Sequence, residues 1–124
     1  MIGRVNKITL FVNNQEEAKE FWTRKCNFMV RKQNYMGDPS WLEVAPQENA
    51  GTVFVLCDKQ KMLKENPNVN TCHPYVVLGT SNVVQTVCEL KEKGVTTGEI
   101  KEYPYGKIAT FQDQDKNEYI LKQY

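Results

Sequence analysis

One order of secondary-structure elements occurs twice in this 124-residue chain, and this repeat limits the possible folds more than any single motif. Each half opens with a segment rich in β-branched residues, continues into a capped amphipathic helix, and then gives three strands separated by turns. The halves span about residues 1–58 and 73–124, with a polar linker at 59–72. The sequence therefore predicts a single α+β domain, residues 1–124, built from two βαβββ modules.

The first module shows both the alternation typical of a strand and the apolar spacing typical of a helix. Arg4–Val12 alternates as a strand does, and Asn14 is followed three residues later by Glu17, as in a helix capping box. The apolar residues that recur at helical spacing predict the buried face of a helix ending near Asn27, and they are Ala18, Phe21, Trp22 and Cys26. Three further strands are expected at residues 28–36, 40–45 and 51–57.

The second module repeats this order. We expect a strand over His73–Leu78, then a helix that Ser81 caps and Gly94 ends. The apolar face of this helix is predicted to hold Val84, Val87 and Cys88. Strands are expected at residues 97–103, 107–111 and 118–122. Between the last two strands, short acidic and amide side chains predict a tight structural turn, formed by Asp113, Asp115 and Asn117.

Size and composition restrict how the modules can be used. Each module is too small to bury both its helix and the inner face of its sheet, so two modules are expected to curl mixed sheets around a shared cleft. The formal charge is +1 with both signs interspersed, which argues against nucleic acid as a partner. The longest apolar runs are too short to span a membrane, and no signal-peptide pattern opens the chain, so a cytoplasmic location is expected.

The cysteine pattern argues against a structural zinc site. Its four cysteines are not spaced as C-x-x-C, and His73 is the single histidine. An even count leaves two disulfides as an alternative. Small buried hydrophobic side chains are favoured, because Cys26 and Cys88 fall on predicted apolar helix faces and Cys57 ends a predicted buried strand.

Several motifs, in this order, resemble the vicinal oxygen chelate superfamily, which includes glyoxalases, bleomycin-resistance proteins and extradiol dioxygenases. Ile8–Val12 followed by Ala18–Trp22 is similar to the family's first strand and helix, and Asn27-Phe28 stands where the family usually has Gly-Phe. The strongest similarity is Phe111–Asn117 after Tyr105-Gly106, close to the family's Phe-x-Asp-Pro-Asp-Gly-Asn. Gln114 and Lys116 replace the family's Pro and Gly. The resemblance covers essentially the whole chain.

Enzymes of this family hold a divalent ion in the cleft, through ligands on the first and last strand of each module. The resemblance places Lys7, Val55, His73 and Ile120 at these four positions. Among them, His73 alone has a side chain suited to bind a metal, and Lys7 would put a cation where the ion sits. The resemblance therefore implies a member without a metal cofactor. A two-residue register slip leaves an alternative site of His73, Glu118 and Glu43.

The predicted ligand site is an apolar cleft with Lys7 and His73 near its centre and aromatic residues around them. The expected ligand-binding residues are Lys7, Tyr35, Trp41, Phe54, His73, Tyr75, Tyr103 and Tyr105, whereas Phe11 and Phe111 are assigned to the core. Lys7 favours a planar ligand with an anionic or oxygen-rich group, unless Glu118 or Glu43 pairs with it. In that case Lys7 is structural and the ligand need not be charged.

Three functions remain open at this point. The first is a metal-free protein that binds a small molecule in a dimer cleft, as the bleomycin-resistance proteins do. The second is a glyoxalase-like lyase or dioxygenase with an atypical metal site, or a metal-free enzyme that uses His73 or Lys7 as acid or base. The third is a dimerisation or regulatory domain without a ligand. The absent ligands favour the first, and a homodimer is expected because open sheets leave edges to cover.

Overall fold

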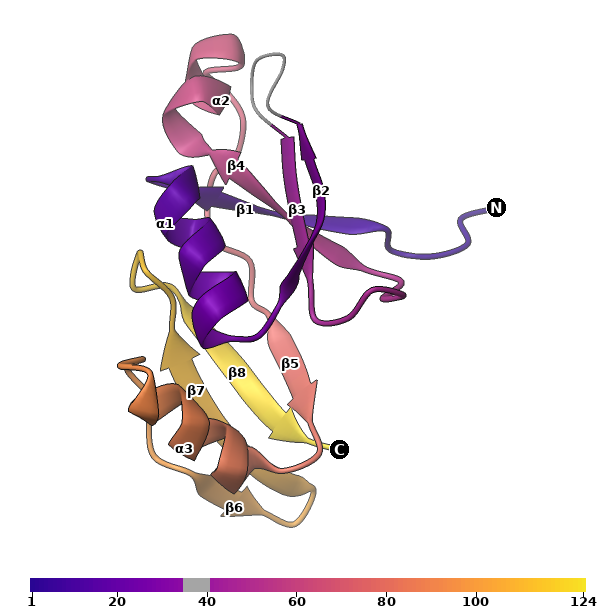
Figure 1. Cartoon of the computed structure of the whole chain (residues 1–124). Coiled ribbons are helices and arrows are strands. Elements are labelled where there is room, and N and C mark those ends of the chain that lie inside the picture. The colour runs from indigo at the N-terminus through magenta and orange to yellow at the C-terminus, as the bar shows by residue number, and fades with distance from the viewer. Residues whose placement is uncertain (35–40) are drawn as a thin grey trace. The chain divides into compact units, whose positions relative to one another are not determined.

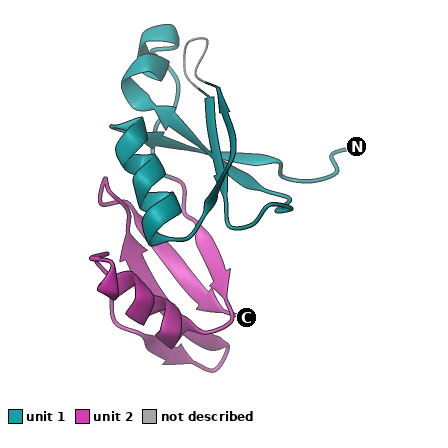
Figure 2. Ribbon diagram, in the orientation of Figure 1, with its two compact units in different colours: residues 1–73 teal, residues 74–124 magenta. Residues whose placement is uncertain are grey.

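A computed structural model describes residues 1–34 and 41–124. Within it the chain divides into two compact units, Met1–His73 and Pro74–Tyr124 (Figure 2). Each unit has its own four-stranded sheet and its own helical segments.

The first unit is a four-stranded mixed sheet with a helix packed on one face (Figure 1). Its strands are β1 (Lys7–Val12), β2 (Met29–Asn34), β3 (Trp41–Ala45) and β4 (Val53–Asp58), in the spatial order β1-β4-β3-β2. β1 is parallel to β4, and the other neighbours are antiparallel. The predicted first strand therefore starts three residues late, at Lys7 instead of Arg4.

Helix α1 (Gln15–Glu20) begins as the sequence predicts, because the Asn14 side chain accepts a hydrogen bond from the Glu17 amide. It continues as a π-helical segment, η1 (Phe21–Lys25). The fully buried Trp22 packs against Phe54 of β4, with ring centroids 5.2 Å apart. This aromatic contact joins helix and sheet and forms the centre of the core of the first unit.

The predicted linker contains a second helix, α2 (Lys59–Glu65), which is longer than the single turn that its sequence indicates. Its start is fixed by Asp58, the last residue of β4, whose side chain accepts a hydrogen bond from the Lys61 amide. The strand therefore runs into the helix without a loop.

The second unit has the same topology as the first. Its elements are β5 (Val77–Thr80), α3 (Val83–Glu92), β6 (Lys101–Tyr103), β7 (Gly106–Gln112) and β8 (Glu118–Gln123), and the strand order is β5-β8-β7-β6. β5 is parallel to β8, as β1 is to β4. The predicted α+β fold of two βαβββ modules is confirmed.

Helix α3 ends in a Schellman motif around Gly94. The Val95 amide donates to the Leu90 carbonyl at 3.0 Å, and the Gly94 amide donates to the Lys91 carbonyl at 3.0 Å. The Gly94 φ of 83° is the left-handed conformation that this motif requires. The predicted end of the helix is confirmed.

Other boundaries in the second unit differ from the prediction. β5 begins at Val77 and not at His73, because Pro74 has no amide to donate to a neighbouring strand. Asn82, and not Ser81, caps α3. Of the expected strand at 97–103, only Lys101–Tyr103 is regular, and Thr97 forms an isolated bridge with Phe111.

The buried face of α3 is also rotated from the predicted one. Val83, Val87 and Leu90 are buried, whereas Val84 is half exposed and Cys88 is exposed. The i, i+4, i+7 spacing of the buried set is a regular helical stripe, and Cys88 lies outside it. None of the four cysteines forms a disulfide, and only Cys57 is fully buried, so the prediction of a buried Cys88 is wrong.

Candidate functional site

In the first unit, the alternation of side chains along each strand separates two faces of the sheet. Leu10, Phe54 and Val44 belong to the face that packs against α1 and η1. The opposite face carries a polar group among apolar residues. We call it the distal face, and it includes Lys7, Trp41, Glu43, Val53 and Val55.

Lys7 and Glu43 form an ion pair at the centre of the distal face. Lys7 Nζ lies 3.3 Å from Glu43 Oε2, the same oxygen that accepts a hydrogen bond from the Trp41 indole at 2.5 Å. Lys7 Nζ also lies 5.5 Å from the centre of the Trp41 ring. The three side chains therefore hold each other in place. Of the two partners predicted for Lys7, Glu43 is the one found.

The charge on Glu43 is stabilised in a poorly hydrated position. Its side chain is only 9% exposed, against 46% for Lys7. Burial by itself would raise the pKa of the Glu43 carboxyl, but the Trp41 hydrogen bond and the nearby Lys7 and Lys32 outweigh burial and lower this pKa. Glu43 is thus a carboxylate at neutral pH, and Lys7 is its counter-ion.

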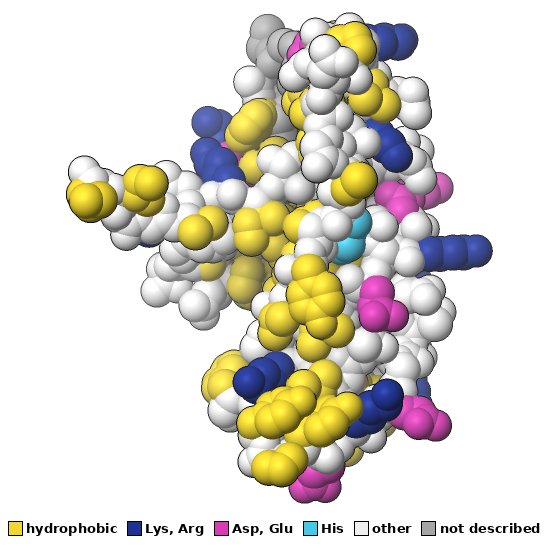
Figure 3. All heavy atoms as spheres, turned by 180° about the vertical axis from the view of Figure 1, so that it is seen from behind, with side chains coloured by type: hydrophobic (Ala, Val, Ile, Leu, Met, Phe, Trp, Pro, Cys, Tyr) yellow, Lys and Arg dark blue, Asp and Glu magenta, His cyan; other side chains and the backbone are white. Residues whose placement is uncertain are grey.

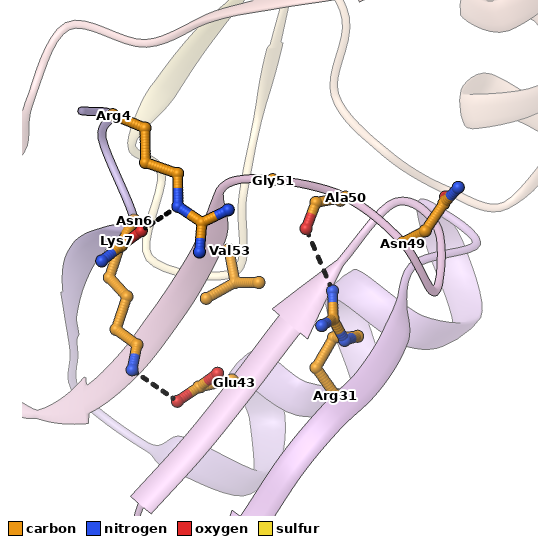
Figure 4. Close-up of a pocket in the computed structure, with 9 residues that line it drawn as sticks. All are labelled: Arg4, Asn6, Lys7, Arg31, Glu43, Asn49, Ala50, Gly51 and Val53. Carbon is orange, nitrogen blue, oxygen red and sulfur yellow. Dashed lines mark hydrogen bonds and ion pairs between the residues drawn. The ribbon is translucent and has the colours of Figure 1, made fainter.

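Beside this ion pair is a pocket of about 430 Å³, contained within the first unit (Figure 4). Its walls come from the chain before β1, from the first residues of β1 and β4, from β2 and β3, and from the loop between β3 and β4. The lining residues are Arg4, Asn6, Lys7, Arg31, Glu43, Asn49, Ala50, Gly51 and Val53. Three of them are cationic and one is acidic, so the lining carries a net charge of +2.

The residues at the four family metal positions do not fit a divalent ion. Val55 is buried and aliphatic, Ile120 offers no lone pair, and Lys7 is a cation already paired with Glu43. Across residues 1–34 and 41–124 no group of three His, Cys, Asp or Glu side chains converges. Of the alternative ligands, Glu43 is already paired with Lys7 and Trp41, and Glu118 belongs to the second unit.

The predicted ligand-binding residues fall into separate groups. Lys7 and Trp41 meet on the distal face, whereas Phe54 lies on the opposite face, in the core between Trp22 and Phe28. His73 is half-buried and precedes β5 without belonging to a strand. Tyr35 lies outside the described residues. The core assignment of Phe111 is confirmed by its burial and its stacking on Tyr119.

The other predicted tyrosines belong to the second unit. Tyr103 and Tyr105 stack in parallel with ring centroids 5.1 Å apart, and Lys122 Nζ lies 5.4 Å from the Tyr105 ring. Both tyrosines and Tyr75 are exposed. Seen from behind, hydrophobic side chains gather over this unit with basic side chains beside them (Figure 3). Tyr103 and Tyr105 therefore form a stacked aromatic pair on the surface of the second unit.

The turn after β7 is structural, as predicted. The buried Asp113 carboxylate accepts hydrogen bonds from the Asp115 and Asn117 amides, at 2.8 and 3.0 Å, and from the Tyr119 hydroxyl at 2.8 Å. Lys116, at the position of the family's glycine, has a φ of 65°. Lys116 therefore holds a left-handed backbone conformation that glycine adopts more readily.

Comparison with known proteins identifies the class. Residues 4–121 match the family model described as the Glyoxalase/Bleomycin resistance protein/Dioxygenase superfamily. Together with the double βαβββ fold, this shows that the chain belongs to that superfamily. Within the described part of the chain, no helix is long and apolar enough to cross a membrane.

Individual relatives are similar over nearly their full length. An uncharacterised protein of Bacillus subtilis (strain 168), YetH, is 32% identical over 99% of this chain and 100% of its own. The crystal structure of TnmS3, an antibiotic binding protein from Streptomyces sp. CB03234, has a TM-score of 0.82 at 30% identity, covering 98% of this chain and 96% of its own. UcmS2 has a TM-score of 0.82 at 27% identity, with full coverage of both chains.

Proposed function

We propose that this protein binds a small molecule without a metal ion and holds a planar, largely apolar ligand against the distal face of the first unit. The observation that carries the proposal is the Lys7–Glu43–Trp41 group. Lys7 occupies a position where the family's enzymes have a metal ligand, and its partner is an internal carboxylate. The site therefore offers a fixed aromatic surface and no coordination sphere.

Trp41 is suited to contact a flat ligand. The residue is 37% exposed, and the hydrogen bond from its indole N–H to Glu43 fixes the ring without covering it. Aromatic rings stack with little loss of conformational entropy when they are already held in place. The similarity to TnmS3, an antibiotic binding protein, supports a small-molecule ligand here.

The proposal includes a homodimer. Each sheet ends in strands with one unpaired edge, β1 and β2 in the first unit and β5 and β6 in the second. A second copy would cover such edges and help to close the binding site. We expect an interface on the order of 2,000 Å² in total. Light scattering of a stable monomer at micromolar concentration would contradict the dimer and leave the Trp41 surface to be tested by itself.

A thermal-shift screen of neutral two- and three-ring aromatic compounds tests the proposal. A true ligand should stabilise the protein by about 2.7 kcal/mol at a hundredfold excess over its Kd. Trp41→Leu should abolish the shift, whereas Tyr105→Leu, the matched control in the second unit, should retain it. No stabilisation across the screen, or equal stabilisation of the Trp41→Leu protein, would overturn the proposal.

The competing function is a glyoxalase-like lyase or dioxygenase with an atypical metal site. Metal analysis of the untagged protein separates the two functions. About one equivalent of a divalent transition metal per chain, lost on His73→Ala, would overturn the metal-independent proposal and favour the enzyme.

A further inference from the structure

The lining of the pocket beside the ion pair has more cationic side chains than acidic ones. The carboxylate of Glu43 is matched by Lys7 at 3.3 Å, and since Glu43 is the one acidic residue of the lining, Arg4 and Arg31 have no acidic partner there. Within the described residues, neither arginine forms an ion pair. As far as the described residues go, two guanidinium groups thus line one pocket without an ion-pair partner.

Arg31 is directed into the pocket by an irregularity in the sheet. In the ladder between β2 and β3, Val30 pairs with Val44 and Lys32 pairs with Glu43, so Arg31 is an extra residue in a β-bulge. A bulge changes the direction of a side chain, and bulges are frequent beside functional sites. Arg31 consequently lines the same pocket as Glu43, and one of its N–H groups donates to the Ala50 carbonyl at 3.2 Å.

Arg4 lies on the opposite wall of the pocket, in the segment before β1, which is hydrogen-bonded to the start of β4. The Thr52 hydroxyl donates to the Val5 carbonyl at 2.7 Å, and the Val53 amide donates to the Asn6 carbonyl at 3.1 Å. Arg4 Nε donates to the Asn6 side chain at 2.7 Å, which leaves its terminal N–H groups available. Figure 4 shows the two guanidinium groups entering the pocket from opposite walls.

We propose that Arg4 and Arg31 form an oxyanion subsite, which binds a carboxylate, sulfate or phosphate group of the small molecule. A guanidinium group that already donates to a neutral oxygen keeps further N–H donors in a planar fork, the geometry that matches an oxyanion. The subsite rests on the proposed function and extends it. It also moves the anion contact from Lys7, which is neutralised by Glu43, to the two arginines.

The test uses sulfate and benzoate as probes, followed by NMR of the arginine side-chain Nε–H groups. The chain has three arginines, so three signals are expected, and Arg→Gln variants assign them. Arg24 is the internal control, because it lies on η1, outside the pocket, with a side chain that is 77% exposed and 3.9 Å from Glu20. We expect saturable shifts of the Arg4 and Arg31 signals and only a small, linear drift of the Arg24 signal.

Affinity measurements on the variants complete the test. Arg4→Gln and Arg31→Gln should each weaken sulfate and benzoate binding by about tenfold or more, since each loses charge-assisted hydrogen bonds. Arg24→Gln should change neither. Benzamide, which is neutral and has the same shape as benzoate, should bind wild type more weakly than benzoate does.

The outcomes separate the subsite from the proposed function. Equal drift of all three arginine signals, or equal binding of benzoate and benzamide, would overturn the subsite. Saturable sulfate binding at Arg4 and Arg31, with no neutral aromatic ligand in the thermal-shift screen, would support the subsite and overturn the proposed function. Binding of neutral aromatic compounds without any anion binding would support the proposed function and overturn the subsite.

Discussion

Asn27 and Gly94 take the same left-handed backbone conformation, with φ of 58° and 83°, at corresponding points of the two units. Each residue comes two positions after the end of its helical segment, η1 or α3, and turns the chain toward the rest of the sheet. Glycine adopts this conformation without strain, and asparagine is among the few other residues that tolerate it. The repeat therefore extends to single backbone positions.

Lys116 adopts the same left-handed backbone conformation, which is unfavourable for a lysine. The substitution Lys116→Gly should therefore stabilise the protein. With a φ of 65°, a lysine at this position is strained by its Cβ. Removing that Cβ should raise the free energy of unfolding by about 1 kcal/mol, measured by urea denaturation. Lys101→Gly in β6 is the control and should lower it by about 0.5–1 kcal/mol, because glycine weakens a regular strand.

Glu43→Gln should destabilise the protein at neutral pH by about 1–2 kcal/mol, since the ion pair with Lys7 and the charged acceptor for Trp41 are lost. Because folding lowers the pKa of Glu43, its carboxylate stabilises the folded state above the ordinary glutamate pKa of about 4.3. That contribution is lost as the pH falls through the lowered folded-state value.

The measurement is urea denaturation of wild type and Glu43→Gln from neutral to acidic pH. The two stability curves should converge in acid. Glu102 is an exposed glutamate of β6, and Glu102→Gln is the control for the effect of a Glu-to-Gln change itself on stability. A stability difference that is independent of pH would show that Glu43 acts through packing alone.

Asp113→Ala should be among the most destabilising single changes in the second unit. Its carboxylate satisfies two backbone amides and the buried Tyr119 hydroxyl, so the substitution leaves several donors without an acceptor. We expect a loss of about 2–4 kcal/mol by urea denaturation. Tyr119→Phe removes only one of these bonds and should cost about 1 kcal/mol. If both variants lose the same amount, the turn does not depend on the carboxylate.

The four thiols should react at distinct rates with an aromatic disulfide reagent. The exposed Cys72 and Cys88 should react first, and the half-buried Cys26 should react more slowly. The buried Cys57 should react only after the protein unfolds. Burial, together with the negative charges of Asp58 and Glu65, raises the pKa of the Cys57 thiol and so reduces its thiolate fraction. A Cys88→Ser variant that keeps the full rapid phase would contradict the exposed position of Cys88.

The sequence was sufficient for features that depend on short-range pattern. The capping of α1 by Asn14, the turn around Asp113 and the stop at Gly94 each require particular side chains at fixed spacing. It was insufficient for the face of α3, because Val83 and Val84 are both apolar and only packing decides which of them is buried.

Contacts in the candidate site also lay beyond sequence patterns. Glu43 was a possible partner of Lys7, but nothing local chose it over Glu118, because register between distant strands decides the pairing. The sequence did not predict Arg31 as a site residue, because the pattern of β2 does not reveal the bulge that places Arg31 in the pocket. Phe54, which the sequence assigned to the site, packs in the core against Trp22.

The parallel pairing of the first and last strands in each unit also governs the order of folding. Lys7 meets Val53, and Val77 meets Ile120, so neither opening strand can join its sheet until nearly all of its unit has been gathered. The antiparallel pairs β2–β3 and β7–β8 close much shorter loops and have the lower entropic cost. We therefore expect these hairpins to form early, with β1 and β5 docking late, so that substitutions in β1 would accelerate unfolding more than they slow folding.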